Sequence, residues 1–404
     1  MPFVIFVAPI LSENAFRMVE AAAGLPDVHL AVITHDGAER LLHLQGRVAH
    51  WRVENVLDVT QLTWAAEGLS RMFGPIHRLF GAYEQLQVPL AGARQRLGIE
   101  GMSVEAANNF RDKARMKTLL RGAGLPCARH RLAGSMDDAI AFAEASGFPV
   151  VVKPPAGAGA LSTFRVDDMP ALVAALRATP PTLEQPVLLE EFVQGEEHSF
   201  ETISVDGRHV WHSLTRYYPT PLTVLQNPWI QWSLVLPREV DDAQYDDIRS
   251  AARRALTVLG MRTGITHLEW FRRSDGSIAI SEVAARPPGA QITQLMSYAH
   301  DFDTVQAWAR VMIFGEFEPP ERKYAAGAAF LRGQGEGRIV AVHGVDEVNR
   351  ELGSLIVAAK APAIGATPST GYEGDGWVIV RHPDTATVER AVLKLVSTIR
   401  VEVA

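Results

Sequence analysis

The sequence predicts a protein of mixed α/β and α+β class, because three different local patterns follow one another along its 404 residues. Residues 1–107 alternate short apolar runs (FVIFVAP, HLAVITH, VAHWRV) with helical stretches, which is typical of a parallel sheet with crossover helices. Residues 108–318 contain two hairpin patterns, each with an Asp-Gly turn. Residues 319–404 mix short strands with Gly-rich turns and end in an amphipathic helix near Val388 to Thr398.

The first block is expected to form a small Rossmann-like domain. Its first strand is followed by the turn APILSENAF, in which Ser12 or Asn14 is a suitable helix N-cap. The turn lacks the GxGxxG pattern that lets the backbone approach a pyrophosphate closely. A nicotinamide or flavin cofactor is therefore not expected here.

Composition and charge exclude several classes of protein. A hydrophobic content of 47% and a charged content of 21% indicate a globular chain rather than a disordered one. The net charge of −7 is spread along the chain and no Lys/Arg cluster is interleaved with aromatics, so we expect no nucleic-acid partner. The single cysteine, Cys127, fits a reducing compartment, and the apolar start from Phe3 to Ile10 is too short to span a bilayer. We expect a cytoplasmic protein without a membrane partner, and the sequence leaves homo-oligomerisation open.

Helix and strand signals are clear at the start of the second block. A helix from about Asp112 to Arg121 is expected to end at the following glycines, with Pro126 just beyond. Ser135 marks the start of the next helix. The segment SGFPVVVKPP then enters a buried strand that must end at Pro154, since proline cannot donate to a sheet.

The second hairpin pattern, THLEWFRRSDGSIAISEV, brings two acids together. If Asp275 and Gly276 are the two central turn residues, Glu269 faces Glu282 on one side of the sheet. Two carboxylates with Cβ atoms about 5 Å apart repel each other unless a cation bridges them or one holds a proton. This geometry suits Mg²⁺, while solvated acids on an exposed face are the alternative.

The same pairing places Arg286 opposite Ile265 and His267 opposite Ala284, close to the two acids. Both side chains could contact an anion held by the metal. The alternatives are a packed or solvated His267, and an Arg286 that hydrogen-bonds loop carbonyls before the Pro-Pro-Gly turn.

Lys153 stands at the end of a predicted strand and precedes the small-residue loop PPAGAGALST. Such a loop can present backbone N–H groups to phosphate, although a packing role is the alternative. It is not a P-loop, because the lysine comes before the glycines rather than after them.

Five segments of the chain occur in the order seen in one family, namely RDKARMKTLLRGAGLP, SGFPVVVKPPAGAGA, LLEEFVQGEEHSFE, GITHLEW and ISEVAARPPG. Together they resemble the ATP-grasp superfamily, and most closely its carboxylate–amine (L-amino acid) ligases. The resemblance covers nearly the whole length. It implies an N-terminal Rossmann-like (pre-ATP-grasp) domain over 1–107, an ATP-grasp domain of two subdomains with ATP between them over 108–318, and a small C-terminal α+β, lid-like domain over 319–404.

The resemblance also implies the cofactors ATP and Mg²⁺, with Mn²⁺ as an alternative ion. Glu269 and Glu282 would hold the metal, in agreement with the hairpin pairing. The residues implied to bind ATP are Lys113 and Lys153 at the phosphates, Gly157 and Gly159 in the covering loop, Glu190, Glu191 and Val193 at the adenine, and Glu197 at the ribose.

The implied reaction activates a carboxylate as an acyl phosphate, and an amine then displaces phosphate to form an amide or peptide bond with release of ADP. The catalytic candidates are Arg286, Lys153 and His267, which lie where charge develops during phosphoryl transfer. Arg286 and Arg332 are candidates for gripping the small-molecule carboxylate. The aromatic-rich segment from Tyr217 to Trp232 predicts that Trp229 lines the substrate pocket, with packing against its own domain as the alternative.

Two other functions remain open at this stage. One is a biotin-carboxylase-like or other bicarbonate-activating enzyme, although the longer glycine run of its loop is missing. The other is an ATP-binding regulator with weakened catalysis, because Ala284 stands where the family usually has an asparagine that ligates a second metal ion.

Overall fold

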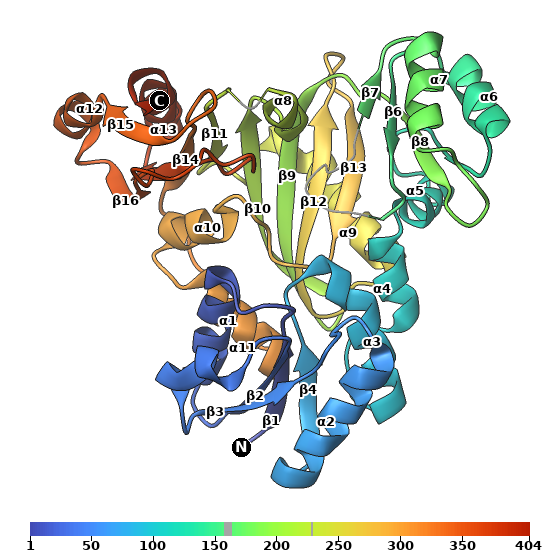
Figure 1. Cartoon of the computed structure of the whole chain (residues 1–404), viewed down its shortest axis with the longest axis vertical. Helices are drawn as coiled ribbons and strands as arrows, with labels where there is room; N and C mark the ends of the chain where they lie inside the picture. Colours follow the sequence, from blue (N-terminus) through green and yellow to red (C-terminus); the bar gives the residue numbers. More distant parts are fainter. Residues whose placement is uncertain (157–163, 228) are drawn as a thin grey trace.

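The computed structural model describes residues 1–156, 164–227 and 229–404. These residues form four β-sheets with helices packed on their faces (Figure 1). Within this part of the chain, no helix is both long enough and apolar enough to cross a membrane.

The N-terminal region is a four-stranded parallel sheet of order β3-β2-β1-β4, as the apolar runs predict. Ser12 caps α1 by accepting a hydrogen bond from Ala15 N, which confirms one of the two expected caps. Helix α11 (Thr304–Phe314) comes from much later in the chain but packs against α1 and β4. The elements of the N-terminal region are β1 (Phe3–Val7), α1 (Glu13–Ala23), β2 (His29–Thr34), η1 (Ala38–Leu44), β3 (Val48–Arg52), α2 (Val59–Phe73), β4 (Ile76–Phe80), η2 (Glu84–Leu86) and α3 (Gln87–Leu97).

A second four-stranded sheet, of order β5-β8-β6-β7, has its own apolar core under α6 and α7. Asp112 and Ser135 cap α5 and α6, and β6 ends immediately before Pro154, as predicted. The elements of this region are α4 (Val104–Arg111), α5 (Lys113–Gly122), β5 (His130–Ala133), α6 (Met136–Ser146), β6 (Val150–Lys153), β7 (Phe164–Val166), α7 (Met169–Ala178) and β8 (Val187–Glu191).

The largest sheet has eight strands in the order β13-β12-β9-β10-β11-β14-β17-β16. Its first hairpin joins β9 to β10 through Asp206 and Gly207, whose φ angles of 50° and 78° fit the predicted two-residue turn. The elements of this stretch of chain are β9 (Glu196–Val205), β10 (Arg208–Tyr218), α8 (Pro221–Gln226), β11 (Trp232–Leu236), η3 (Ala243–Tyr245), α9 (Asp246–Leu259), β12 (Gly264–Arg272), β13 (Ile278–Ala284), α10 (Ile292–His300) and α11 (Thr304–Phe314).

The second hairpin differs from the prediction in its turn but agrees with it at the acidic pair. The predicted two-residue turn is wrong: Arg273 N donates to Ser277 O, so three residues form the loop, with Gly276 at φ 83°. A bulge between Glu269 and Trp270 then shifts the register by one, leaving Ser281 as the extra residue. The two departures cancel, and Glu269 faces Glu282 as predicted.

The C-terminal region contributes three strands to the large sheet. Strand β14 pairs with β11, so strands from both sides of the predicted domain boundary at residue 318 belong to one continuous sheet. Strands β15 and β18 form a separate two-stranded sheet, and α13 packs across β14 and β17. The elements are β14 (Ala325–Leu331), β15 (Ile339–His343), α12 (Val345–Leu352), β16 (Ile356–Lys360), β17 (Gly376–His382), α13 (Thr385–Thr398) and β18 (Arg400–Val403).

Candidate active site

A cavity of about 470 Å³ lies where the three larger sheets meet. It is lined by residues from the N-terminal region, the small sheet, the hairpin β12–β13 and the C-terminal region. Ten of the predicted site residues line it, namely Lys113, Lys153, Glu190, Glu191, Val193, Glu197, His267, Glu269, Glu282 and Arg286. Gly157 and Gly159 lie outside the described residues.

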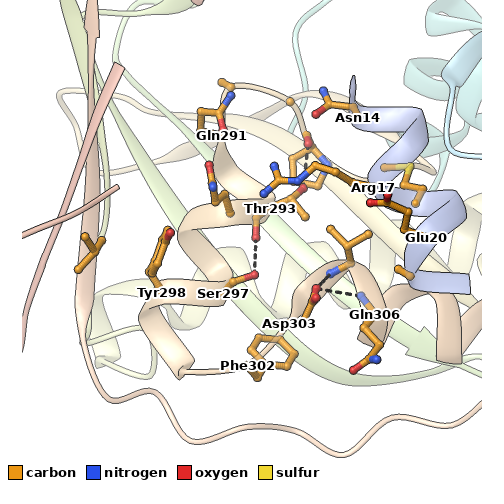
Figure 2. Close-up of a pocket in the computed structure, with 18 of the residues that line it drawn as sticks. Asn14, Arg17, Glu20, Gln291, Thr293, Ser297, Tyr298, Phe302, Asp303 and Gln306 are labelled. Atoms are coloured by element: carbon orange, nitrogen blue, oxygen red, sulfur yellow. Dashed lines mark hydrogen bonds between the residues drawn. The ribbon is translucent and has the colours of Figure 1, made fainter. Parts of the chain in front are cut away.

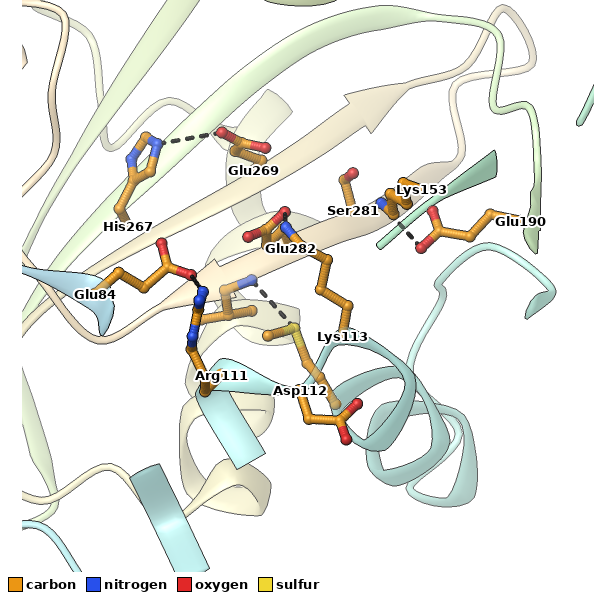
Figure 3. Close-up of polar contacts among 12 residues, drawn as sticks. Glu84, Arg111, Asp112, Lys113, Lys153, Glu190, His267, Glu269, Ser281 and Glu282 are labelled. Carbon is orange, nitrogen blue, oxygen red and sulfur yellow. Dashed lines mark hydrogen bonds and ion pairs between the residues drawn. The ribbon is translucent and has the colours of Figure 1, made fainter. Parts of the chain in front are cut away.

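The acidic pair sits on adjacent strands at the centre of this cavity (Figure 3). Glu282 forms an ion pair with Lys113, which comes from the first turn of α5. Burial opposes ionisation of Glu269, but hydrogen bonding to His267 and the positive charges around it lower its pKa to about 2. Glu269 therefore carries its negative charge throughout the neutral range.

His267 lies between two carboxylates. Its Nδ1 is 2.8 Å from Oε1 of Glu201, and its Nε2 is 3.5 Å from Oε1 of Glu269. Burial alone would lower the pKa of His267, but the two carboxylates raise it to about 9. Glu201 is fully buried and also accepts hydrogen bonds from Ser199 and Thr215. Glu201 thus fixes the orientation and charge of the imidazole, which in turn fixes Glu269.

Two buried lysines share the carboxylate of Glu190. Nζ of Lys153 is 2.9 Å from Oε1, and Nζ of Lys117 is 3.4 Å from Oε2. Although burial favours neutral Lys153, attraction to Glu190 and Glu282 raises its pKa. Lys117 also donates to the carbonyl of Ser281, the bulged residue of β13, at 2.6 Å. The bulge therefore ties strand β13 to α5 through the buried side chain of Lys117.

The residues expected at the nucleoside also line the cavity. Glu191 and Val193 lie at and just beyond the end of β8, while Glu197 is the second residue of β9. The side chain of Glu191 is about one-quarter exposed, and its Oε2 forms an ion pair with Nε of Arg129 at 2.6 Å. Burial and repulsion from Glu269 raise the pKa of Glu197 well above its usual value.

Arg286 is held by an acid that the sequence did not reveal. Glu84, in the short helix after β4, lies 3.3 Å from Nε of Arg286 and 2.6 Å from Nη1 of Arg111. Glu84 is buried and lines the cavity, and its carboxylate is neutralised by the guanidinium groups of Arg111 and Arg286. No local pattern marks this glutamate, because its partners lie far away in the chain.

Two predicted substrate residues do not line the cavity. Arg332 is buried, and its guanidinium donates to the carbonyl oxygens of Val224 in α8 and Gly371. Trp229 is 56% exposed, and its carbonyl accepts a hydrogen bond from Gln334. Instead, Leu222 and Leu225 of α8 and Tyr372 of the C-terminal region reach the cavity. Arg332 thus supports the two segments that carry these side chains.

The donor set fits a magnesium ion that shares its shell with phosphate oxygens. Among the described residues, no group of three or more His, Cys, Asp or Glu is arranged to hold a metal by itself. Mg²⁺ is usually held by one or two carboxylates together with substrate phosphates and water, which matches the pair Glu269 and Glu282. Ala284 has no ligating atom, as the sequence indicated, and its strand partner is His267.

Comparisons with known proteins agree with this geometry. A family model described as ATP-grasp domain matches residues 118–295. An L-arginine-specific L-amino acid ligase of Bacillus subtilis is 27% identical over 258 residues, which are 61% of this chain and 61% of that protein. Alanine–anticapsin ligase of Bacillus subtilis (strain 168) is 27% identical over 253 residues, 56% of this chain and 52% of that protein. The chain therefore spans only about half to three-fifths of these curated relatives.

Solved structures with the same fold cover the chain almost completely. The crystal structure of L-amino acid ligase from Bacillus licheniformis has a TM-score of 0.74 at 19% identity, covering 99% of this chain and 98% of that one. N5-carboxyaminoimidazole ribonucleotide synthetase from Thermotoga maritima has a TM-score of 0.70 at 17% identity, covering 100% of both chains. Residues 118–295 therefore match an ATP-grasp domain, and the chain is similar to L-amino acid ligases in sequence and in fold.

Proposed function

We propose that this protein is an ATP-dependent carboxylate–amine ligase that forms an amide or peptide bond and releases ADP and phosphate. The observation that carries the proposal is the pairing of Glu269 with Glu282 in one cavity with Lys113, Lys153 and Arg286. Two acids and three cations at one end of a cavity suit the triphosphate of ATP with a bridging metal ion. The names of the curated relatives, L-amino acid ligase and alanine–anticapsin ligase, support the same class of reaction.

The nucleotide would lie between the small sheet and the hairpin β12–β13. Glu190, Glu191 and Val193 would line the adenine slot, partly through backbone groups at the end of β8. Glu197 would bind the ribose, and Lys113 and Lys153 would contact the phosphates from two sides. Gly157 and Gly159 would belong to the loop over the phosphates, as the family resemblance implies.

Glu269 and Glu282 would hold Mg²⁺, or Mn²⁺, which would neutralise charge on the transferring phosphoryl group when bound. The cationic side chains of Lys153 and Arg286 spread the same charge over the protein. His267, fixed by Glu201, holds Glu269 in place and keeps it ionised. Its role in this proposal is electrostatic, since its ring nitrogens already face two carboxylates.

The reaction has two steps. An oxygen of the substrate carboxylate attacks the γ-phosphorus of ATP, and the bond between that phosphorus and the β,γ-bridging oxygen breaks, so that ADP leaves. The amine nitrogen then attacks the acyl carbon, phosphate leaves, and the nitrogen loses a proton. Arg286 is placed to hold the carboxylate during the first step and the departing phosphate during the second.

Hydroxylamine tests this mechanism because it captures an acyl phosphate as a hydroxamate. We expect hydroxamate and ADP in equal amounts when purified protein is incubated with ATP, Mg²⁺ and a panel of amino acids. AMP as the stoichiometric product would contradict the mechanism. ATP binding without turnover on any acid would favour the regulator, and bicarbonate-dependent ADP release would favour a bicarbonate-activating enzyme.

A further inference from the structure

A groove of about 1070 Å³ adjoins the cavity described above (Figure 2). It runs between α1 of the N-terminal region and α10 with the segment that follows it. The groove and the cavity share five lining residues, namely Asn14, Met18, Pro288, Gly289 and Ala290. The two spaces therefore meet at the loop that begins with Arg286, and the proposed function makes no use of the groove.

Several charged groups in the groove already have partners among the described residues. Arg381 binds the carbonyl of Tyr298 and the carboxylate of Asp301. Asp303 caps α11, and Glu20 lies 3.3 Å from His43. These side chains line the groove, but their existing partners leave them few free hydrogen-bonding positions for a ligand.

Arg17 and Gln294 are two of the groove residues with a polar side-chain group that has no partner among the described residues. The guanidinium of Arg17, on the exposed side of α1, makes no hydrogen bond or ion pair there, and it is labelled near Thr293 in Figure 2. Oε1 of Gln294, in α10, is buried and accepts no hydrogen bond. A buried acceptor without a donor destabilises the protein, and a ligand that donates to it removes that cost.

The boundary between groove and cavity is held in an uncommon backbone conformation. Ala290 and Gln291 have φ angles of 50° and 59°, a region that residues with a side chain rarely occupy. Glu373 stabilises it by accepting hydrogen bonds from Ala290 N and from Nε2 of Gln291, each at 3.0 Å. Strained backbone that is held so specifically is common where a ligand must be positioned.

We propose that the groove binds the amine substrate, and that this substrate is a short peptide or extended amino acid whose carboxylate contacts Arg17 and whose N–H donates to Gln294. The inference rests on the proposed function, because the amine must reach the acyl carbon next to Arg286. The carboxylate to be activated belongs in the inner cavity with the acidic pair, so the groove is left for the second substrate. Its volume is at the upper end of the range for small-molecule sites, which is more than a single amino acid needs.

Triglycine and its C-terminal amide test the role of Arg17. We expect Arg17→Ala to raise the KM for triglycine about tenfold, since a charge-assisted hydrogen bond contributes roughly 1.5–3 kcal/mol. The KM for the amide, which lacks the carboxylate, should change much less. Arg71→Ala is the matched control, because Arg71 is exposed on α2 and lines neither space. Equal KM values for triglycine in the Arg17→Ala variant and the wild-type protein would overturn the proposal.

Gln294→Leu separates binding from folding. The substitution removes a buried acceptor without a partner, so the melting temperature should stay the same or rise while the KM for triglycine increases. A falling melting temperature with unchanged KM would assign Gln294 to packing and contradict its role here.

Calorimetry of triglycine binding to the protein without ATP makes the test independent of turnover. Wild-type protein should bind triglycine more tightly than Arg17→Ala, whether or not hydroxamate forms in the previous section's experiment. Triglycine binding without hydroxamate formation would support peptide binding in the groove and contradict the proposed ligase activity. Hydroxamate formation without any effect of Arg17→Ala on triglycine binding would support the ligase activity and contradict peptide binding in the groove.

Discussion

Glu84 and Arg286 are 202 residues apart in the chain, yet Oε2 of the glutamate lies 3.3 Å from Nε of the arginine. This ion pair joins the N-terminal region to the loop after β13, which carries the arginine. The N-terminal region thus contributes to the candidate site directly and is more than a support for it.

Glu84→Gln tests this link. The amide keeps the shape of the side chain but removes the charge that holds Arg286 and Arg111, so we expect kcat for ADP release to fall about tenfold or more. The KM for ATP should change little, because Glu84 lies away from the predicted adenine slot. Glu100→Gln is the control, since the exposed Glu100 carboxylate pairs with Arg78 at 3.2 Å. An equal loss in both variants would refute a specific role of Glu84.

Glu282→Gln tests the metal pair. It deletes one of two facing charges, and we expect folding to be kept while Mg²⁺-dependent ADP release falls about 10²-fold. Raising the Mg²⁺ concentration should restore part of the rate. The matched control is Glu316→Gln, which removes an exposed carboxylate paired with Arg310 at 2.6 Å. Wild-type turnover at ordinary Mg²⁺ would remove Glu282 from the site.

The pH dependence of stability tests the buried histidine. The pKa of His267 is about 9 in the folded protein, against about 6.5 for an unfolded chain. Because the folded-state pKa is raised, the stabilisation is complete below about pH 6.5 and is lost as pH rises to about 9, by at most about 3 kcal/mol. Urea unfolding without nucleotide or metal should show this loss in the wild-type protein and not in His267→Asn.

Two other buried histidines do not interfere with that measurement. Burial lowers the pKa of His198 and of His300 to about 4. Their effect on the free energy of unfolding therefore falls between about pH 4 and 6.5, where acid destabilises the protein. If His267→Asn showed the same loss above pH 6.5 as the wild-type protein, the imidazolium would not be its source.

Leu225→Ala tests which part of the aromatic-rich segment contacts substrate. Leu225 lines the cavity whereas Trp229 is 56% exposed, so the leucine substitution should change the preference among carboxylate or amine substrates. We expect a several-fold change in relative kcat/KM, since a few methyl groups in a pocket are worth about 1–3 kcal/mol. Trp229→Ala should leave the preference nearly unchanged. A larger effect from Trp229→Ala would restore the prediction made from the sequence.

Local patterns predicted much of the fold and the acidic pair. The caps at Ser12 and Ser135, the Pro154 strand end and the Asp206–Gly207 turn depend on neighbours in the chain, and these predictions were confirmed. The pairing of Glu269 with Glu282 was also confirmed, but only because an unforeseen bulge compensates for a longer turn. A bulge depends on what packs against the strand, here the ammonium of Lys117, and the sequence of the hairpin does not contain that information.

Residues that act across long distances could not be predicted. Glu84 reaches Arg286 only after the N-terminal region packs against the large sheet, and Glu201 reaches His267 only after β9 pairs with β12. Glu373 reaches Gln291 only after the loop before β17 meets the loop after β13. Arg332 was expected to touch substrate because it is charged, whereas its guanidinium is buried against main-chain carbonyls. A charged residue gives no sign in the sequence of whether its partner is a ligand or the protein's own backbone.

The shared sheet limits how this protein can move. Five residues of β11 pair with β14, so swinging the C-terminal region away as a hinged flap would break a row of backbone hydrogen bonds. The sheet β5-β8-β6-β7 has its own core and, within the described residues, pairs with no strand of the other sheets. If the protein binds a nucleotide as proposed, opening the site at that smaller sheet would break fewer backbone hydrogen bonds than opening it at the C-terminal region.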